Sequence, residues 1–399
     1  MANITKRTHK DGSNVYLIRV FRGRDQYGDQ LKPYTTTWTP EPGMTPKQEE
    51  KALNRFVTLY EEKCKSGMVS TERKTFAEYA TYVIDLKERS NAKALTTSSY
   101  SRTLERINDV NLNGFGHIKL DEIRPDMLNN FYKALAKPGV NHKTGGGLSA
   151  QTIKGYHCFI SAVFSQAVKE QLVPYNIASR ATPPKTTSHE VEALEIEDVT
   201  KLIELIDHEP LMWRAMVHLL IATGARRGEI LGLHWQDIDM INNKVYLRNN
   251  LIYVPKKGIE NSTLKRGRSH TVSVSPAVMA ILRQWKAEQA RELLQIGTKS
   301  SHQGHVFTRW NGAPMYPSEA SRYLTNWSKA HNLPHIYPHK LRHTQASLLI
   351  NQGVDIVSVS KRLGHAKVST TTDIYAHILK KADEAVAETI TNLFYADNK

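Results

Sequence analysis

The sequence is poor in cysteine and has no long hydrophobic run. Its 399 residues include two cysteines, Cys64 and Cys158, too few for a disulfide scaffold or for a zinc site built from cysteine. The opening stretch, MANITKRTHKDG, lacks the apolar core of a secretory signal peptide, and no apolar stretch is long enough to cross a bilayer. We therefore expect a soluble, intracellular protein that works in a reducing compartment and has no membrane partner.

Acidic residues are scarce relative to basic ones. The chain has 39 Asp and Glu against 54 Lys and Arg, a formal net charge of +15. Such a chain is expected to bind a polyanion, and nucleic acid is the leading candidate because neutralised phosphates release their counterions. A membrane surface is less favoured, because the basic residues are spread along the chain and do not line one amphipathic segment.

Residue patterning predicts a small N-terminal domain over residues 1–70. Two stretches rich in β-formers, 15–21 and 34–38, are expected to be strands. A helix is expected to begin at Pro46, which follows a threonine of the kind that caps helices. Basic and aromatic side chains on this small β-sheet plus helix favour a surface that reads a nucleic-acid groove or backbone, with a charged accessory domain as the alternative.

The rest of the chain is predicted to be mainly helical and to form two further domains. Residues 74–180 show helical periodicity and are expected to be all α. A linker rich in proline and small polar residues follows at 182–188. Residues 190–399 are expected to be mostly helical around one small three-stranded sheet at 245–247, 251–254 and 271–274. The predicted fold class is therefore a multidomain, mainly α protein.

Four short motifs in the last domain carry the candidate chemistry. The first, ATGARRGE, places Arg226 at a corner between two helices, with Glu229 one turn further on to orient it. The second, HKLR, puts His339 and Arg342 on one helix face. The third is LGH, ending at His365, and the fourth is TTTDIYAH, which contains Tyr375. Each motif alone is also compatible with a solvated corner, a charged surface helix, a glycine cap or a packing tyrosine.

A metal site is a weaker interpretation of the second motif. His339 and His343 are four residues apart on a predicted helix, a spacing that zinc enzymes use. The glutamate of the HExxH pattern is missing and no third ligand is evident, so zinc is not expected.

Taken in order, the four motifs resemble those of the tyrosine recombinase (phage-type integrase) family. The layout is most similar to lambda-type and conjugative-transposon integrases. The resemblance implies an arm-site DNA-binding domain at 1–70, a core-site DNA-binding domain at 74–180 and a catalytic domain at 190–399. A predicted amphipathic helix at 380–394 would dock onto a neighbouring protomer. The implied function is site-specific cutting and rejoining of DNA, through a 3′-phosphotyrosine intermediate, to integrate or excise a mobile element.

The resemblance also implies the roles of the site residues. Tyr375 would be the nucleophile, and Arg226 and Arg342 would bind the phosphate. His339 would assist the loss of the tyrosine proton, and His365 would hydrogen-bond the phosphate. The family also uses a lysine on a β-hairpin, which would donate a proton to the leaving group. Lys265 fits that place best, although Lys256, Lys257 and Arg266 compete for it. Glu229 would support Arg226. Neither a metal nor another cofactor is implied.

Two other functions compete with recombination. A type IB topoisomerase-like enzyme would use the same chemistry only to relax DNA. A non-catalytic DNA-binding regulator would also be basic and helical, but it would have no need for the four motifs together. The expected partners are double-stranded DNA at core and arm sites, further copies of the chain in a tetramer on that DNA, and an excisionase or DNA-bending protein. This work would take place on the bacterial nucleoid in the cytoplasm.

Overall fold

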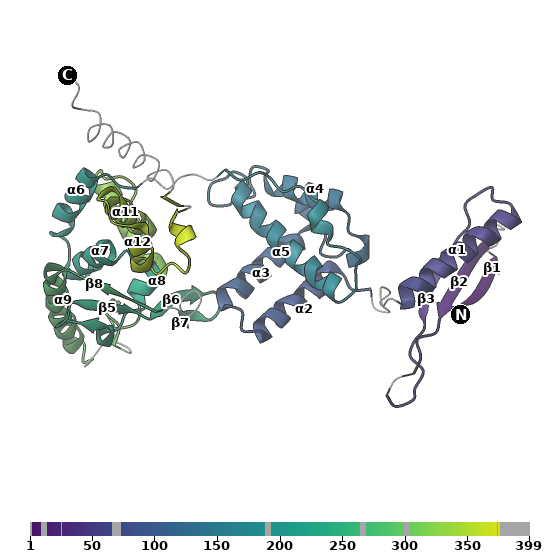
Figure 1. The fold of residues 1–399 in the computed structure, drawn as a ribbon, viewed down its shortest axis with the longest axis horizontal. Coiled ribbons are helices and arrows are strands. Elements are labelled where there is room, and N and C mark those ends of the chain that lie inside the picture. The colour runs from purple at the N-terminus through teal and green to yellow at the C-terminus, as the bar shows by residue number, and fades with distance from the viewer. Residues whose placement is uncertain are drawn as a thin grey trace, which may run out of the picture. The chain divides into compact units, whose positions relative to one another are not determined.

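The computed structural model describes residues 2–8, 14–24, 26–65, 73–187, 193–263, 269–298, 304–372 and 374–375. The chain divides into two compact units, residues 1–187 and 188–399 (Figure 1), and the boundary falls in the predicted linker. No helix within the described ranges combines the length and apolarity needed to cross a membrane.

The first unit begins with a three-stranded antiparallel sheet and one helix. Strands β1 (Asn3–Thr8), β2 (Asn14–Val20) and β3 (Tyr34–Trp38) pair in the order β1-β2-β3. Helix α1 (Pro46–Lys65) covers the sheet, and the ring of Phe56 lies 6.4 Å from that of Trp38. Two strands and the helix were predicted from the sequence. Strand β1 was not, because every one of its residues is exposed and no alternation of apolar side chains marks it.

The remainder of the first unit is helical, as expected. Its helices are α2 (Phe76–Arg89), α3 (Ala94–Ile107), α4 (Pro125–Leu135) and α5 (Ala150–Lys169), joined by the short 3-10 helices η1 (Val110–Leu112), η2 (Leu120–Glu122) and η3 (Ile177–Arg180). Four buried aromatic side chains from separate segments form the centre of the core: Phe76, Phe115, Phe131 and Phe164. A reciprocal capping box fixes the start of α2, where the backbone N–H of Thr75 donates to Glu78 at 2.7 Å.

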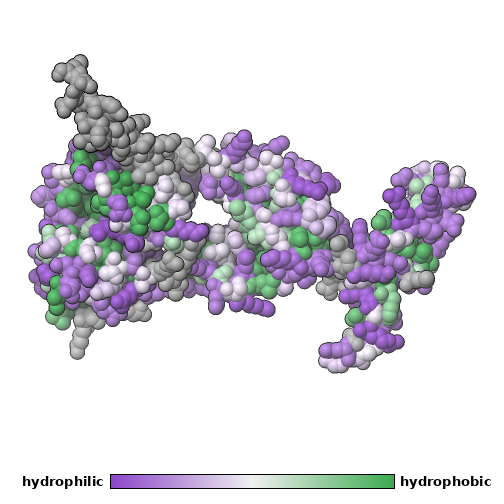
Figure 2. All heavy atoms as spheres, viewed as in Figure 1, coloured by the Kyte–Doolittle hydropathy of each residue, from purple (hydrophilic) through white to green (hydrophobic). Residues whose placement is uncertain are grey.

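The second unit is built around one apolar helix. Helix α7 (Leu211–Thr223) packs against α6 (Ile196–Ile206), α8 (Arg227–Leu231), α9 (Pro276–Gln295) and α11 (Pro338–Asn351). The other helices are η4 (Trp235–Asp237), α10 (Pro317–Ala330) and α12 (Ile356–Arg362). Most of the surface is polar, but apolar side chains gather around α11 and α12 (Figure 2), where Val354 and Val357 are 38% and 43% exposed.

The small sheet of this unit contains different strands from those predicted. Strands β4 (Ile238–Asp239), β5 (Lys244–Leu247) and β8 (His270–Ser273) form the three-stranded sheet. The predicted strand at 251–254 instead belongs to β6 (Asn249–Val254), which pairs with β7 (Gly258–Thr263) in a separate hairpin. The sequence of β7, GIENST, is too polar to signal a strand, so its partner was assigned to the wrong sheet. Lys265 and the predicted helix at 380–394 lie outside the described residues.

Candidate active site

A tight turn between α7 and α8 carries Arg226. Helix α7 ends where Gly224 adopts a left-handed conformation, with φ of +61°, and its N–H donates to the carbonyl of Leu220 at 2.9 Å. A Cβ atom at Gly224 would lie 1.9 Å from Oε1 of Gln345. The backbone angle of this turn favours glycine, and a side chain here would also have to displace the end of the Gln345 side chain on α11.

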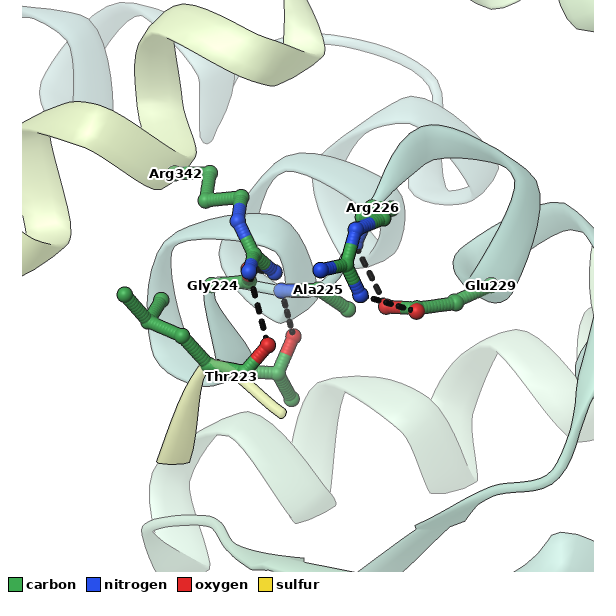
Figure 3. A network of polar contacts seen from close by, with 7 residues as sticks. Thr223, Gly224, Ala225, Arg226, Glu229 and Arg342 are labelled. Carbon is green, nitrogen blue, oxygen red and sulfur yellow. Dashed lines mark hydrogen bonds and ion pairs between the residues drawn. The ribbon is translucent and has the colours of Figure 1, made fainter. Parts of the chain in front are cut away.

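Glu229 holds Arg226 at two points. One carboxylate oxygen accepts from the backbone N–H of Arg226 at 2.8 Å, and the other accepts from its Nη1 at 2.7 Å. The carboxylate of Glu229 is 3% exposed, whereas the side chain of Arg226 is 36% exposed. Glu229 thus orients the guanidinium of Arg226 and leaves part of that side chain accessible. The ion pair between the two residues is the contact expected from the sequence (Figure 3).

Arg342 enters the same space from α11 and is almost completely buried. Its Nη1 donates to the carbonyl of Gly224 and its Nη2 to the carbonyl of Leu363, both at 2.7 Å. The guanidinium groups of Arg342 and Arg226 lie side by side above the turn that begins at Thr223 (Figure 3). Burial, together with the nearby charge of Arg226, lowers the pKa of Arg342 to about 10. Two cations beside one carboxylate leave an excess positive charge, the condition that an anion would relieve.

His365 lies at the edge of this positive site, directly after α12. Gly364 ends the helix in a left-handed conformation, and Nδ1 of His365 lies 2.7 Å from Oγ1 of Thr371. Burial and the charges of Arg342 and Arg226 lower the pKa of His365 to about 4. The imidazole is therefore neutral at physiological pH, and its second nitrogen is available to a ligand.

Tyr375 is buried within the same unit, among the apolar side chains of α11 and α12. It is 3% exposed and packs in a cluster with Ala346, Ile350, Val359 and Leu363. Its hydroxyl lies 2.9 Å from Nδ1 of His343. Burial raises the pKa of Tyr375 to about 12, although the charge of Arg342 opposes the rise. The phenol is therefore neutral in this arrangement and needs a base to become a nucleophile.

Two histidines near the site were not identified as candidates from the sequence. His343 was considered only as a metal ligand, yet it lies between Tyr375 and His339. The Nε2 atoms of His343 and His339 are 3.0 Å apart. His270, at the start of β8, lies close to Gly364, where an added Cβ would come within 2.6 Å of the His270 ring. Its Nε2 is buried and has no hydrogen-bond partner among the residues that the structure describes. His343 was detectable as a second histidine on the HKLRH helix; His270 belongs to no motif.

The structure thus brings six of the seven predicted site residues into one region, and the seventh, Lys265, lies outside the described residues. The positive charges of Arg226 and Arg342 act on His339 and on His365, and that of Arg342 acts on Tyr375. Within the described part of the chain, no group of three or more His, Cys, Asp or Glu residues is placed to hold a metal ion.

Comparisons with known proteins identify the family of the chain. The model of the Phage integrase family matches residues 192–382, and that of the Phage integrase SAM-like domain matches residues 75–182. Tyrosine recombinase XerC of Alcanivorax borkumensis is 31% identical over 237 residues, which are 58% of this chain and 70% of that protein. The chain belongs to the tyrosine recombinase (phage integrase) family.

Other relatives place the recombinase among integrases. The ICEBs1 integrase of Bacillus subtilis is 26% identical over 252 residues, 63% of this chain and 68% of that protein. The Tn1549 transposon integrase, solved with transposon right end DNA, shares the fold with a TM-score of 0.62 at 20% identity, covering 79% and 99% of the two chains. Lambda integrase, solved as a tetramer bound to a Holliday junction, has a TM-score of 0.53 at 16% identity. The match covers 91% of this chain and 95% of that chain.

Replacing Gly224 by alanine is expected to disturb the turn that carries Arg226. The new Cβ would clash with Gln345 and would strain a left-handed backbone, so the second unit should lose about 1 kcal/mol or more of stability. Thermal unfolding of the full chain measures this. Gly155→Ala is the matched control, because a Cβ at that position on α5 meets nothing within 4 Å, and it should be neutral or stabilising. Equal behaviour of the two variants would contradict the account of the turn.

The buried histidines predict a loss of stability in mild acid. Burial, first of all, lowers the pKa of His343 and of His365 to about 4, against about 6.5 in an unfolded chain. The unfolded state therefore binds more protons between these values. The contribution of the two neutral imidazoles to the free energy of unfolding should be fully present above about pH 6.5. It should fall towards pH 4, by up to about 1.4 kcal/mol per pH unit for each histidine. Unfolding midpoints across this range measure it; a flat profile would contradict the neutral imidazoles.

Proposed function

We propose that this recombinase cuts and rejoins DNA strands at specific sites, through a covalent 3′-phosphotyrosine intermediate, to integrate or excise a mobile element. The observation that carries the proposal is the convergence of Arg226, Arg342 and Tyr375, from three distant segments, on one positively charged region of the catalytic unit. The similarity to the ICEBs1 integrase and the fold shared with the Tn1549 transposon integrase support the same conclusion.

Each side chain suits one part of the reaction. The phenolic oxygen of Tyr375 attacks the phosphorus, and the bond to the 5′ oxygen breaks. Charge that develops on the non-bridging oxygens is held by the guanidinium groups of Arg226 and Arg342. The neutral imidazole of His365 donates its Nε2–H to a phosphate oxygen. Lys265 donates a proton to the leaving 5′ oxygen, and the phosphotyrosine bond keeps the energy needed to rejoin a strand.

The remaining domains supply DNA contacts in this proposal. Residues 74–180 bind the core site and residues 1–70 bind an arm site. The excess of basic residues supports both roles. Lambda integrase was solved as a tetramer on a Holliday junction, and we propose the same state for this chain, with the segment at 380–394 docked on a neighbouring protomer. An excisionase or a DNA-bending protein would set the direction of recombination.

The covalent intermediate can be detected directly. The full chain is incubated with nicked duplexes taken from the DNA that flanks its own coding sequence, and products are separated on a denaturing gel. We expect a protein–DNA adduct that Tyr375→Phe abolishes and Tyr253→Phe preserves, since Tyr253 lies exposed on β6. An adduct that survives Tyr375→Phe would contradict the assignment, and tight DNA binding without any adduct would favour a regulator.

Replacing Arg342 by lysine should abolish most of the cleavage while keeping the charge. A lysine has no planar fork, so it cannot donate to the carbonyls of Gly224 and Leu363 together and still face a phosphate. We expect adduct formation to slow by about 100-fold or more. Arg322→Lys, at an exposed position on α10, is the control. Cleavage by Arg342→Lys within threefold of the unmodified chain would argue that charge alone is needed.

A further inference from the structure

Three aromatic side chains form a continuous hydrogen-bonded chain beside the arginine pair. The hydroxyl of Tyr375 lies 2.9 Å from Nδ1 of His343. On the other side of the same ring, Nε2 of His343 lies 3.0 Å from Nε2 of His339. Exposure increases along this chain, since Tyr375 and His343 are 3% and 6% exposed and His339 is exposed to solvent. The chain thus joins a buried phenol to the surface.

The proton positions in this chain follow from hydrogen-bond satisfaction. Among the described residues, His343 is the hydrogen-bond partner of the buried Tyr375 hydroxyl, so the phenol must donate its proton to Nδ1. The proton of neutral His343 then sits on Nε2 and is donated to Nε2 of His339. His339 in turn carries its own proton on Nδ1. The reverse assignment would leave the O–H of Tyr375 buried without an acceptor.

Tyr375 is 3% exposed, and among the described residues its hydroxyl is hydrogen-bonded to His343, which gives its proton a path through the protein. We propose that His343 is a further catalytic residue that receives the proton of Tyr375 and passes its own proton to His339, a relay for strand cleavage; this proposal rests on the function proposed above. His343, rather than His339, then touches the reacting atom, and His339 is the terminal acceptor.

The step balances in protons and electrons. The Tyr375 proton moves to Nδ1 of His343 while the Nε2 proton of His343 moves to His339, so His343 ends neutral and His339 becomes an imidazolium. The phenolate oxygen forms a bond to phosphorus with the electron pair released by its proton. The 5′ oxygen leaves with the electron pair of the broken bond and takes a proton from the general acid, Lys265. The exposed His339 then returns its proton to water.

The charged groups around the relay favour this direction. Arg342, on the same helix, faces both Tyr375 and His343, and its charge stabilises a phenolate. Arg226 lies in the turn before α8, and its partner Glu229 lies on α8 itself. Two further histidines border the site: His270 at the start of β8 and His365 after the end of α12. Burial and the charge of Arg342 disfavour an imidazolium at His343. Both guanidinium groups also act on His339, so it is the exposure of His339 to solvent that suits it to hold the proton at the end of the relay.

The proton positions can be tested in the free protein without any DNA. The full chain is labelled with 15N-histidine, and imidazole nitrogen shifts are assigned with His343→Asn and His339→Gln variants. We expect neutral His343 protonated on Nε2 and neutral His339 protonated on Nδ1, the tautomers that the relay requires. A His343 protonated on Nδ1 would donate towards Tyr375 and would overturn the relay.

Cleavage kinetics then separate a proton-transfer role from a structural one. His343→Asn keeps an acceptor near the Tyr375 hydroxyl but cannot accept a proton, so adduct formation on the flanking-DNA duplexes should fall by about 100-fold or more. The defect should shrink when Tyr375 is replaced by a fluorotyrosine, whose hydroxyl is more acidic. A purely structural role predicts a defect that fluorination leaves unchanged. His208→Asn, at an exposed position, is the control and should cleave normally.

Two results would overturn the relay although the enzyme is a recombinase. One is His343→Asn cleaving within threefold of the unmodified chain with the same pH profile. The other is faster cleavage by His343→Gln, which would mark the contact with Tyr375 as a latch that restrains the nucleophile. If the unmodified chain forms no adduct, the proposed function fails, and the relay fails with it as a step of strand cleavage, whatever the histidine tautomers are.

Discussion

The buried guanidinium of Arg342 is the interaction on which the catalytic unit depends. Its two donors join the carbonyl of Gly224, after α7, to that of Leu363, after α12, while its own backbone belongs to α11. One side chain therefore fixes three segments that are far apart in the sequence. A buried charge is costly unless it is paired and hydrogen-bonded. Arg342 has its hydrogen bonds, and Glu229, which is bonded to Arg226, is the nearby negative charge.

The same positive charge explains the protonation of the surrounding groups. Two guanidinium groups beside one carboxylate give the site a net charge of about +1, and each lowers the pKa of His339 and His365. The imidazoles therefore stay neutral at physiological pH, which leaves them free to accept a proton or to bond an anion. The excess positive charge that would favour an anion thus also keeps these two imidazoles unprotonated before any ligand binds.

Much of this site follows from the sequence, because its residues are placed by local rules. Gly224 and Gly364 end helices in the left-handed conformation, and Glu229 reaches Arg226 across one turn. Ordered motifs therefore identified six side chains that the structure brings together. The partners of Tyr375 could not be found in this way, since its contact with His343 depends on how α11 packs against the segment after α12. His270 was missed for the same reason, because its neighbour Gly364 is distant in sequence. The polar strands β1 and β7 lack the apolar alternation by which strands are recognised.

The central claim is that two guanidinium groups and one phenol act on a single backbone phosphate. A crystal structure of the recombinase covalently trapped on its own DNA site tests it most directly. The account predicts one phosphorus atom bonded to the phenolic oxygen of Tyr375, with donors of both Arg226 and Arg342 on its non-bridging oxygens. Guanidinium groups bound to different phosphates, or a covalent bond to another tyrosine, would contradict it.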